Sequence, residues 1–242
     1  MVTGSHNPKN YNGFKIVLDR SSLIEKEILL LKKRIENDNF LTGKGKLSNQ
    51  SFDQKYIEEL NEKIILGKKL KVVLDCGNGA GSVLGPTIFK KFSDELIELF
   101  CKVDGSFPNH HPDPSDPKNL SDLIKAVELH KADVGIALDG DGDRLGIVDS
   151  DGEIIYPDRY LSLMSKDILK KYKESKIVFD VKCSNQLKRT IEKHKGIPIM
   201  TKTGHSFIKS EIKKNNAILG GEMSGHICLL YTSDAADDCV CV

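Results

Sequence analysis

The chain has 242 residues, of which 39% are hydrophobic and 29% are charged, as is typical of a globular protein that buries a core. The 36 Lys and Arg residues nearly balance the 35 Asp and Glu residues, leaving a net charge of +1. This balance, without a basic domain or tail, argues against nucleic acid as a partner. No apolar run reaches the ~18 residues of a membrane helix, and the first residues lack the basic and apolar regions of a signal peptide.

Six cysteines are spread along the chain. They are Cys76, Cys101, Cys183, Cys228, Cys239 and Cys241. Their spacing fits neither a C-x-x-C motif nor a zinc framework. We therefore expect reduced thiols in a cytoplasmic protein with no membrane partner.

Residues 1–51 predict a polar loop, one strand and one helix. The loop at residues 3–8 reads TGSHNP, residues 14–18 form an apolar run typical of a strand, and Ser22 is expected to cap the helix. One strand and one helix cannot close a core. We therefore expect missing structure upstream of Met1, or a partner that supplies it.

Residues 52–153 predict an α/β unit. Its expected elements are a helix at 52–67, a strand at 70–74, a helix through Ile88, a strand at 96–100, a helix at 120–130 and a strand at 134–138. The Pro-, Asp- and His-rich residues 104–118 predict a loop. The last strand delivers acidic residues at its carboxyl end, where α/β sheets are expected to carry ligand loops.

Residues 154–228 repeat this alternation of helices and strands. The expected elements are helices at 158–172, 184–194 and 206–214 and strands at 177–181, 197–200 and 217–219. The last strand leads into a glycine-rich loop at residues 220–226. The final residues, 229–242, do not continue the pattern and form an atypical tail.

Three aspartates alternate with glycines directly after the strand at 134–138. Alternate residues of an extended turn point the same way, so Asp139, Asp141 and Asp143 are expected to converge and to suit Mg²⁺ or Ca²⁺. An EF-hand loop would need Gly and Glu where Arg144 and Ser150 stand. A plain acidic surface turn is the remaining alternative, although an arginine directly beside the carboxylates favours a site.

Ser5 offers a hydroxyl that can carry a phosphoryl group. A phosphoserine would supply an oxygen ligand that a three-aspartate metal site lacks, and the metal would neutralise charge during transfer. His6 and Asn7 beside it could equally be local caps, as Ser5 could be an ordinary turn serine. Lys15 and Lys182 are candidates for proton transfer or phosphate contact, or are simply solvated.

Polar side chains on glycine-rich turns near the end of the chain suit sugar hydroxyls. Glu222, Ser224 and His226 follow a Gly-Gly pair that lets the backbone approach a ligand. Gly204 permits an unusual turn before the last helix, where His205 acts as a ligand contact or as a cap. A flexible loop without function is the alternative for both segments.

A glycine-rich turn at residues 76–81 invites comparison with dinucleotide-binding sites. The fingerprint G-x-G-x-x-G needs a third glycine at the position of Ser82, so the match fails. A tight strand-to-helix turn is the better interpretation.

Together these motifs resemble the α-D-phosphohexomutase superfamily, in particular its bacterial phosphomannomutase/phosphoglucomutase branch, from residue 2 to residue 226. The resemblance is carried by residues 3–8, 11–15, 103–114, 139–144, 203–206 and 221–226. It implies consecutive α/β domains with mixed sheets and a site in a central cleft. The implied domains are a truncated first domain at 1–51, a second at 52–153 and an incomplete third at 154–228. The tail and the absence of a fourth domain mark the chain as an internal fragment.

The same resemblance implies the roles of individual residues. It implies Ser5, His6, Lys15, Arg144 and His226 as catalytic residues, Asn7, Lys182, Gly204, His205, Glu222 and Ser224 as substrate-binding residues, and Ser5, Asp139, Asp141 and Asp143 as metal ligands.

The implied reaction interconverts hexose 1-phosphates and 6-phosphates of mannose or glucose through a phosphoserine and a 1,6-bisphosphate. Mg²⁺ is the implied cofactor and hexose 1,6-bisphosphate the implied activator, and the full-length protein is expected to be a monomer. The alternatives are a phosphoglucosamine mutase and a non-catalytic fragment that binds metal and sugar phosphate. The 242-residue chain alone is expected to be inactive.

Overall fold

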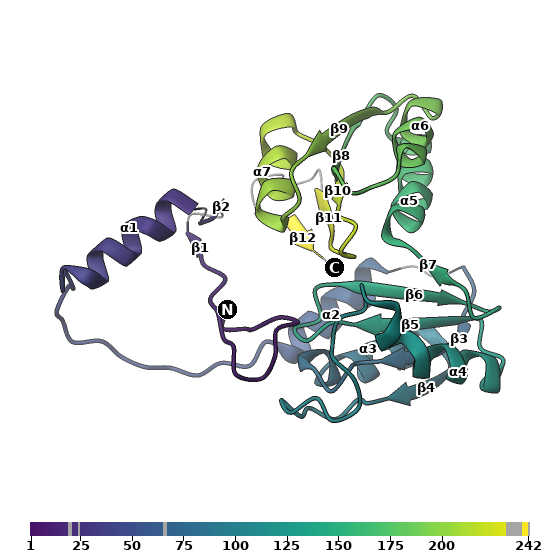
Figure 1. The fold of residues 1–242 in the computed structure, drawn as a ribbon, viewed down its shortest axis with the longest axis horizontal. Coiled ribbons are helices and arrows are strands. Elements are labelled where there is room, and N and C mark those ends of the chain that lie inside the picture. Colours follow the sequence, from purple (N-terminus) through teal and green to yellow (C-terminus); the bar gives the residue numbers. More distant parts are fainter. Residues whose placement is uncertain (19–20, 24, 65–66, 231–238, 242) are drawn as a thin grey trace.

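The computed structural model describes residues 1–18, 21–23, 25–64, 67–230 and 239–241. Two α/β units lie next to each other, and the helical part of an N-terminal segment extends away from both (Figure 1). Among the described residues, no helix has both the length and the apolar character needed to cross a bilayer.

The first unit is built on a five-stranded sheet in the order β4-β3-β5-β6-β7. Its strands are β3 (Leu70–Asp75), β4 (Ser93–Leu99), β5 (Val134–Leu138), β6 (Leu145–Asp149) and β7 (Ile154–Ile155). The first three are parallel, whereas β6 and β7 continue the sheet as antiparallel strands. Neither β6 nor β7 was predicted from the sequence, and through β7 this sheet reaches two residues beyond 153.

Helices cover both faces of this sheet. They are α3 (Gly85–Phe92) and α4 (Ser121–His130), with short 3₁₀ helices at Ala80–Ser82 and Pro117–Leu120. Because side chains of a strand alternate between faces, Val73 packs in a cluster with Leu123 and Val127 of α4. The neighbouring residue Leu74 lies against α3 at Gly85. The unit is therefore a three-layer sandwich.

The second unit has a five-stranded sheet in the order β12-β11-β10-β8-β9. Its strands are β8 (Lys176–Asp180), β9 (Ile197–Thr201), β10 (Leu219–Gly221), β11 (Ile227–Leu230) and β12 (Cys239–Cys241). Strands β8, β9 and β10 are parallel, and β11 and β12 are antiparallel additions. Of the tail expected at 229–242, residues 231–238 and 242 lie outside the described residues.

Alternation along β8 again divides the core between two helical layers. Ile177 and Phe179 share a buried cluster with residues of α5 (Pro157–Lys171) and α6 (Asn185–Lys193). Val178 faces the other way and joins the cluster of α7 (His205–Asn215). The two units thus have the same architecture, which leaves the carboxyl ends of their parallel strands free to carry loops.

The N-terminal segment differs from the sequence-based prediction. Of the expected strand at 14–18, only Val17–Leu18 (β1) forms a strand, which pairs with Ser21–Ser22 (β2), and Phe14 forms an isolated bridge with Val2. The helix α1 (Glu25–Glu36) begins at Glu25 rather than directly after Ser22. Ser22 lies in β2, three positions before the first residue of α1, so it does not stand at the N-cap position. The helix α2 (Asp53–Lys63) follows and buries none of its side chains.

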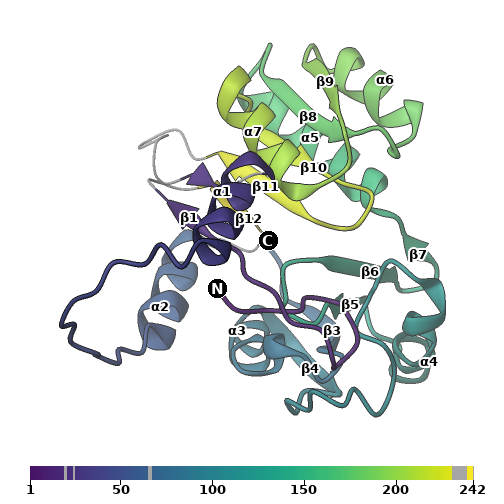
Figure 2. The same ribbon diagram turned by 60° about the vertical axis from the view of Figure 1, so that its left-hand side comes forward.

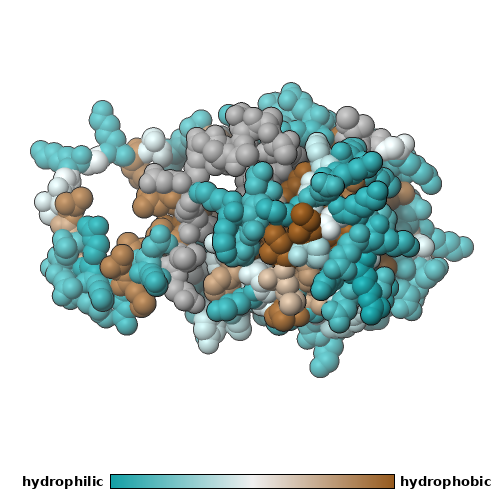
Figure 3. Space-filling view, turned by 90° about the horizontal axis from the view of Figure 1, so that it is seen from above, coloured by the Kyte–Doolittle hydropathy of each residue, from teal (hydrophilic) through white to brown (hydrophobic). Residues whose placement is uncertain are grey.

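Apolar side chains of α1 remain at the surface. Ile28, Leu29, Leu30 and Ile35 are each more than half exposed. Figure 3 shows apolar surface at the left end of the molecule, which carries α1 in Figure 1. Hydrophobic periodicity therefore predicted the helix itself. In the described part of the chain, however, nothing covers its apolar face.

Candidate active site

A cleft of about 600 Å³ brings the three predicted loops together. It is lined by Ser5, His6, Lys15, Asp113, Ser115, Asp143, Arg144, Lys182, Thr203, Gly204, His205, Ser206, Glu222, Met223, Ser224 and His226. These residues come from the N-terminal segment and from both α/β units. The site is thus assembled across the whole chain rather than within one unit.

The N-terminal loop holds Ser5 against the acidic loop of the first unit. The Ser5 hydroxyl donates to Asp139 Oδ2 at 3.0 Å, and the Thr3 hydroxyl donates to Asp141 Oδ2 at 3.0 Å. Figure 2 shows the purple N-terminal chain running across this unit. A Cβ at Gly140 would lie 2.1 Å from the Ser5 carbonyl oxygen, so only glycine permits this approach.

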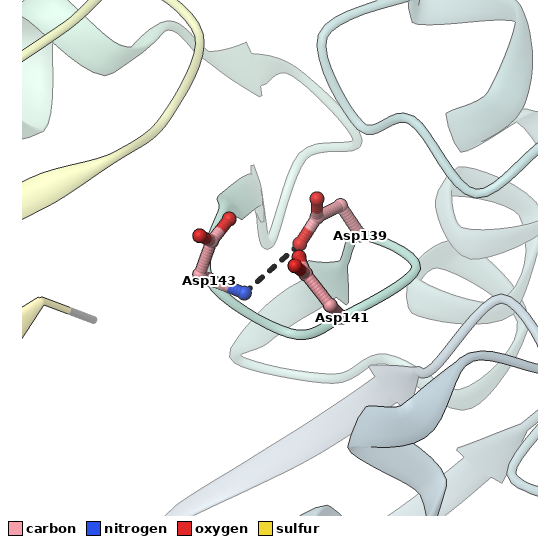
Figure 4. Close-up of side chains that lie close together, drawn as sticks. All are labelled: Asp139, Asp141 and Asp143. Carbon is pink, nitrogen blue, oxygen red and sulfur yellow. Dashed lines mark hydrogen bonds between the residues drawn. The ribbon is translucent and has the colours of Figure 1, made fainter. Parts of the chain in front are cut away.

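Asp139, Asp141 and Asp143 form one acidic cluster after β5. One carboxylate oxygen from each lies within 4.8 Å of the others, and Figure 4 shows the three side chains on the same loop. Asp139 is fully buried, and its Oδ1 accepts from the backbone N–H groups of Asp143 and Arg144 at 2.9 and 3.0 Å. The loop backbone therefore fixes one oxygen of Asp139 and leaves the other toward Ser5.

The cluster has the properties of a cation site. Burial, and then the charges of Asp141 and Asp143, raise the pKa of Asp139 to about 7. Asp141 Oδ1 is buried and accepts no hydrogen bond from any described residue. A divalent cation would relieve both costs, because hard cations take carboxylate oxygens as ligands. The residues present therefore fit Mg²⁺.

Lys15 supplies positive charge beside this cluster. Its ammonium donates to Asp141 Oδ2 at 2.6 Å and also to Asp143 Oδ2. Burial alone would lower the pKa of Lys15, but the bonds to the two carboxylates outweigh it and raise the pKa. Lys15 is therefore a permanent cation at the site.

Arg144 adds a second cation on the other side of Ser5. Its guanidinium lies 4.0 Å from carboxylate oxygens of both Asp113 and Asp139. Burial, and then the charge of Arg144, lower the pKa of His6, whose Nδ1 lies 3.2 Å from Ser5 Oγ. His6 is therefore a neutral imidazole beside the serine hydroxyl near pH 7.

The loops of the second unit form the opposite wall. Glu222 is buried, its Oε2 accepts from the Ser224 hydroxyl at 3.0 Å, and its Oε1 has no hydrogen-bond partner in the described chain. Burial raises the pKa of Glu222, although the Ser224 hydrogen bond opposes this shift. Glu222 lines the cleft, and a buried carboxylate oxygen without a partner can accept a hydrogen bond from a ligand hydroxyl.

Asp180 holds these loops together through hydrogen bonds. This fully buried residue ends β8 and accepts from the Thr203 hydroxyl at 2.9 Å, the Met223 N–H at 3.3 Å and the Cys183 thiol at 3.2 Å. One carboxylate therefore joins the loops that carry Lys182, Gly204–His205 and Glu222.

His226 connects the two walls of the cleft. Its Nδ1 lies 3.1 Å from the carbonyl oxygen of Asp143 and 3.7 Å from its carboxylate. Burial alone would raise the pKa of Asp143, but His226 and Lys15 hold it below its ordinary value. The His205 ring centroid lies 5.6 Å from that of His226, and burial, then the charge of His226, lower the pKa of His205.

Most residues singled out from the sequence lie in or beside the cleft. Asn7 is the exception, because it is exposed and its side-chain amide donates to the Gly4 carbonyl within its own turn. Three residues of the site, Thr3, Asp113 and Asp180, were not predicted from the sequence. Asp113 had one available signal, since it stands between two prolines in the predicted loop, whereas a single aspartate at a strand end gives none.

The two units match one protein family. Residues 54–152 match the family described as phosphoglucomutase/phosphomannomutase, alpha/beta/alpha domain II, and residues 156–241 match the corresponding domain III. The first stretch contains the acidic loop and the second contains the loops of the opposite wall.

Individual proteins match most of this chain. A phosphomannomutase/phosphoglucomutase of Pseudomonas syringae pv. tomato is 49% identical over 227 residues, which cover 94% of this chain and 49% of the relative. A phosphoglucomutase of Neisseria meningitidis serogroup A is 47% identical over 229 residues, covering 94% and 50%. A crystal structure of a phosphoglucomutase/phosphomannomutase family protein from Burkholderia thailandensis has a TM-score of 0.92 at 46% identity, covering 94% and 50%. The chain spans about half the length of the curated relatives it matches.

Proposed function

The chain belongs to the α-D-phosphohexomutase superfamily, and from this premise we propose that it carries the reaction centre of a hexose-phosphate mutase. The proposed reaction interconverts the 1-phosphates and 6-phosphates of glucose and mannose. The observation that carries it is the 3.0 Å hydrogen bond between Ser5 Oγ and Asp139. It places a phosphorylatable hydroxyl directly beside an acidic cluster suited to Mg²⁺.

Ser5 is the proposed phosphoryl carrier. Asp139, Asp141 and Asp143 would hold Mg²⁺ together with an oxygen of the phosphorylated Ser5, and the bound ion would supply charge neutralisation. His6 Nδ1, a neutral acceptor 3.2 Å from Ser5 Oγ, can take the hydroxyl proton when Ser5 is phosphorylated. Phosphoryl transfer depends mainly on positioning and electrostatic stabilisation, which this arrangement provides.

Lys15 and Arg144 flank the position of the transferred group. Lys15 keeps its charge through its bonds to Asp141 and Asp143, and Arg144 reaches the same pocket from the side of Asp113. Fixed positive charges at a transferring phosphoryl group stabilise the negative charge of the transition state. Both residues therefore act on the reacting group rather than on the sugar.

Glu222 and Ser224 are proposed to hold the sugar ring. The free Oε1 of Glu222 can accept from one hydroxyl, and Ser224 can donate to or accept from its neighbour. Lys182, Gly204 and His205 line the same wall. The ring would bind in two orientations. In one, a hexose monophosphate would take a phosphoryl group from phosphorylated Ser5, and in the other the resulting 1,6-bisphosphate would return its original phosphate to Ser5.

A chimera tests this proposal. The matched residues of this chain replace the corresponding half of the Pseudomonas syringae relative, and conversion of glucose 1-phosphate to 6-phosphate is measured with Mg²⁺ and glucose 1,6-bisphosphate. We expect turnover that Ser5→Ala abolishes while the fold is kept, because Ser5 is only partly buried and the loss of one hydroxyl hydrogen bond costs about 1 kcal/mol. Equal turnover in the Ser5→Ala chimera would refute the assignment.

The 242-residue chain alone is expected to show no measurable turnover. Its relatives are about twice as long, and positioning of the non-reacting phosphate supplies much of the barrier reduction in such transfers. The same assay on the purified chain checks this expectation. Robust turnover would show that this half holds every group the reaction requires.

A further inference from the structure

The thiols of Cys76 and Cys101 lie in contact in the first unit. Cys76 follows β3 and Cys101 follows β4, which are neighbouring parallel strands, and their Sγ atoms are 3.3 Å apart. Both are free thiols. We propose that Cys76 and Cys101 form a modification site at which a hydroperoxide converts the two thiols into a reversible disulfide.

The backbone already holds the two residues at the spacing this requires. The Cys76 N–H donates to the Leu99 carbonyl at 3.1 Å, which continues the β3–β4 ladder to the point where both cysteines leave it. A disulfide bond is about 2.05 Å long, so the sulfur atoms must approach each other by little more than about 1 Å. Rotation of the side chains and a small backbone shift can supply that movement.

The two thiols differ in a way that sets the order of steps. Cys76 is fully buried, whereas Cys101 is only partly buried and is the thiol that a small oxidant reaches. Contact with Cys76 lowers the pKa of Cys101, although burial opposes this shift. The same contact, and then burial, raise the pKa of Cys76. The partly exposed Cys101 is thus the attacking thiol, and the buried Cys76 is the resolving thiol.

The chemistry balances with hydrogen peroxide as the oxidant. The Cys101 sulfur attacks one peroxide oxygen, the O–O bond breaks, and the leaving hydroxide takes a proton to become water. Cys76 then loses its proton and attacks the sulfenic sulfur, so that the S–S bond forms, the S–O bond breaks and a second water leaves. Two thiols lose two electrons, and one peroxide becomes two waters.

Closure of this disulfide would act on the acidic loop. The turn after Cys76 packs on Gly140, because the Ala80 N–H donates to the Gly140 carbonyl at 2.9 Å and a Cβ at Gly79 would lie 2.7 Å from the same oxygen. Gly140 is the neighbour of Asp139. A shift at Cys76 therefore reaches the proposed Mg²⁺ ligands, and this consequence rests on the proposed function.

Cys183 serves as an internal control. Burial, and then its hydrogen bond to Asp180, raise the pKa of Cys183, so this thiol stays protonated and reacts slowly. It lies in the second unit, away from the Cys76–Cys101 pair.

Peptide mapping of the purified 242-residue chain tests the modification. The chain is treated with hydrogen peroxide, remaining thiols are alkylated, and the tryptic peptides 72–90 and 92–102, which carry Cys76 and Cys101, are sought by mass spectrometry. We expect these peptides as one cross-linked species that a dithiol reductant separates, with Cys183 alkylated. Sulfinic acid at Cys101 without a cross-link, or both cysteines alkylated, would overturn the proposal.

Variants separate the disulfide from its effect on the metal loop. Cys101→Ser should prevent the cross-link. Because Cys101 is only partly buried, this variant should fold even if Cys76→Ser does not. Cys183→Ser should leave the cross-link unchanged. Titration with Mg²⁺ should show weaker affinity after oxidation, on the order of tenfold, in the wild-type chain but not in Cys101→Ser. Unchanged affinity in a cross-linked chain would refute the coupling. A reduced chain that binds no Mg²⁺ would refute the proposed metal site, while the cross-link itself is judged by the peptide map.

Discussion

The two α/β units share an architecture, and the proposed function assigns them different ligands. Each ends a central parallel strand with a fully buried aspartate, Asp75 on β3 and Asp180 on β8. Asp75 accepts from the Gly77 N–H at 2.8 Å and lies 3.0 Å from His110 Nε2. Asp180 accepts from Thr203 and Met223. In both units a buried carboxylate anchors the loops that reach the cleft.

The loops themselves carry opposite chemistry. The first unit presents the acidic cluster Asp139, Asp141 and Asp143, and the second presents hydroxyl, imidazole and ammonium groups around a single carboxylate, Glu222. We infer from this contrast that the scaffold fixes where a ligand binds, whereas the loop residues select the ligand, which under the proposed function is a cation in the first unit and a sugar in the second. Changes in one wall should therefore affect one ligand and spare the other.

The largest effect is expected in the first unit. Asp139→Asn should weaken Mg²⁺ binding by roughly 100-fold or more, because even residues that only support a metal ligand cost 10–100-fold when changed. Isothermal titration with Mg²⁺ measures this loss. The matched control Asp151→Asn makes the same charge change in an exposed turn of the same unit and should bind normally. Equal losses in both variants would mean that overall charge, not the cluster, attracts the cation.

The next effect is expected in the second unit. Glu222→Gln should weaken binding of glucose 1-phosphate and glucose 6-phosphate alike by roughly 10–100-fold, the value of a hydrogen bond to a charged group. Amide shifts in NMR titrations of the chimera follow both ligands. Mg²⁺ affinity should stay unchanged. A variant impaired with only one of the two sugar phosphates would contradict the shared grip.

A smaller effect should follow from removing the anchor of the second wall. Asp180→Ala leaves the Met223 N–H without its acceptor, a loss of about 1–3 kcal/mol for a buried group. Hydrogen exchange at the Met223 amide should accelerate accordingly, whereas the exposed control Asp167→Ala should leave it unchanged. Unaltered exchange in Asp180→Ala would show that the loop is held by other contacts.

The smallest effect is expected in the pKa of His110, which contacts Asp75 in the first unit. The hydrogen bond to Asp75 raises the pKa of His110 above 6.5, although burial opposes it. Stability from this pair is therefore fully present below pH 6.5 and is lost as the pH rises through the native pKa. NMR titration of the His110 ring should give a midpoint above 6.5 that falls in Asp75→Asn. A midpoint at or below pH 6.5 in the wild-type chain would show that Asp75 does not hold His110 as Asp180 is proposed to hold the loops of the second unit.

Regular elements with a buried face were readily predicted from the sequence. The strand at 134–138 was predicted at its observed bounds, because an apolar run ends directly at a polar loop. The antiparallel strands β6 and β7 were missed, although β6 pairs with β5 and β7 pairs with β6, because β6 contains a glycine and β7 has only two residues, so neither shows a clear strand pattern. The N-terminal strand was predicted too long because its apolar residues, such as Val17, remain exposed in the described chain.

In the candidate site, too, residues with a local sequence signal were predicted and residues without one were missed. Ser5 and the aspartates were found because each lies in a short loop with an unusual composition. Asp113 and Asp180 were missed because their importance comes from partners distant in the sequence, Arg144 in one case and Met223 in the other. The three-dimensional meeting of loops, rather than any local motif, makes these residues part of the site.

Phosphorylation of Ser5 tests the central claim most directly. The chimera is incubated with glucose 1,6-bisphosphate and Mg²⁺, and the tryptic peptide that carries Ser5 is sequenced by mass spectrometry. The account predicts one phosphoryl group on Ser5, dependent on Mg²⁺ and absent from Asp139→Asn. A chain that binds Mg²⁺ but gains phosphate at another residue, or gains none, would contradict the account.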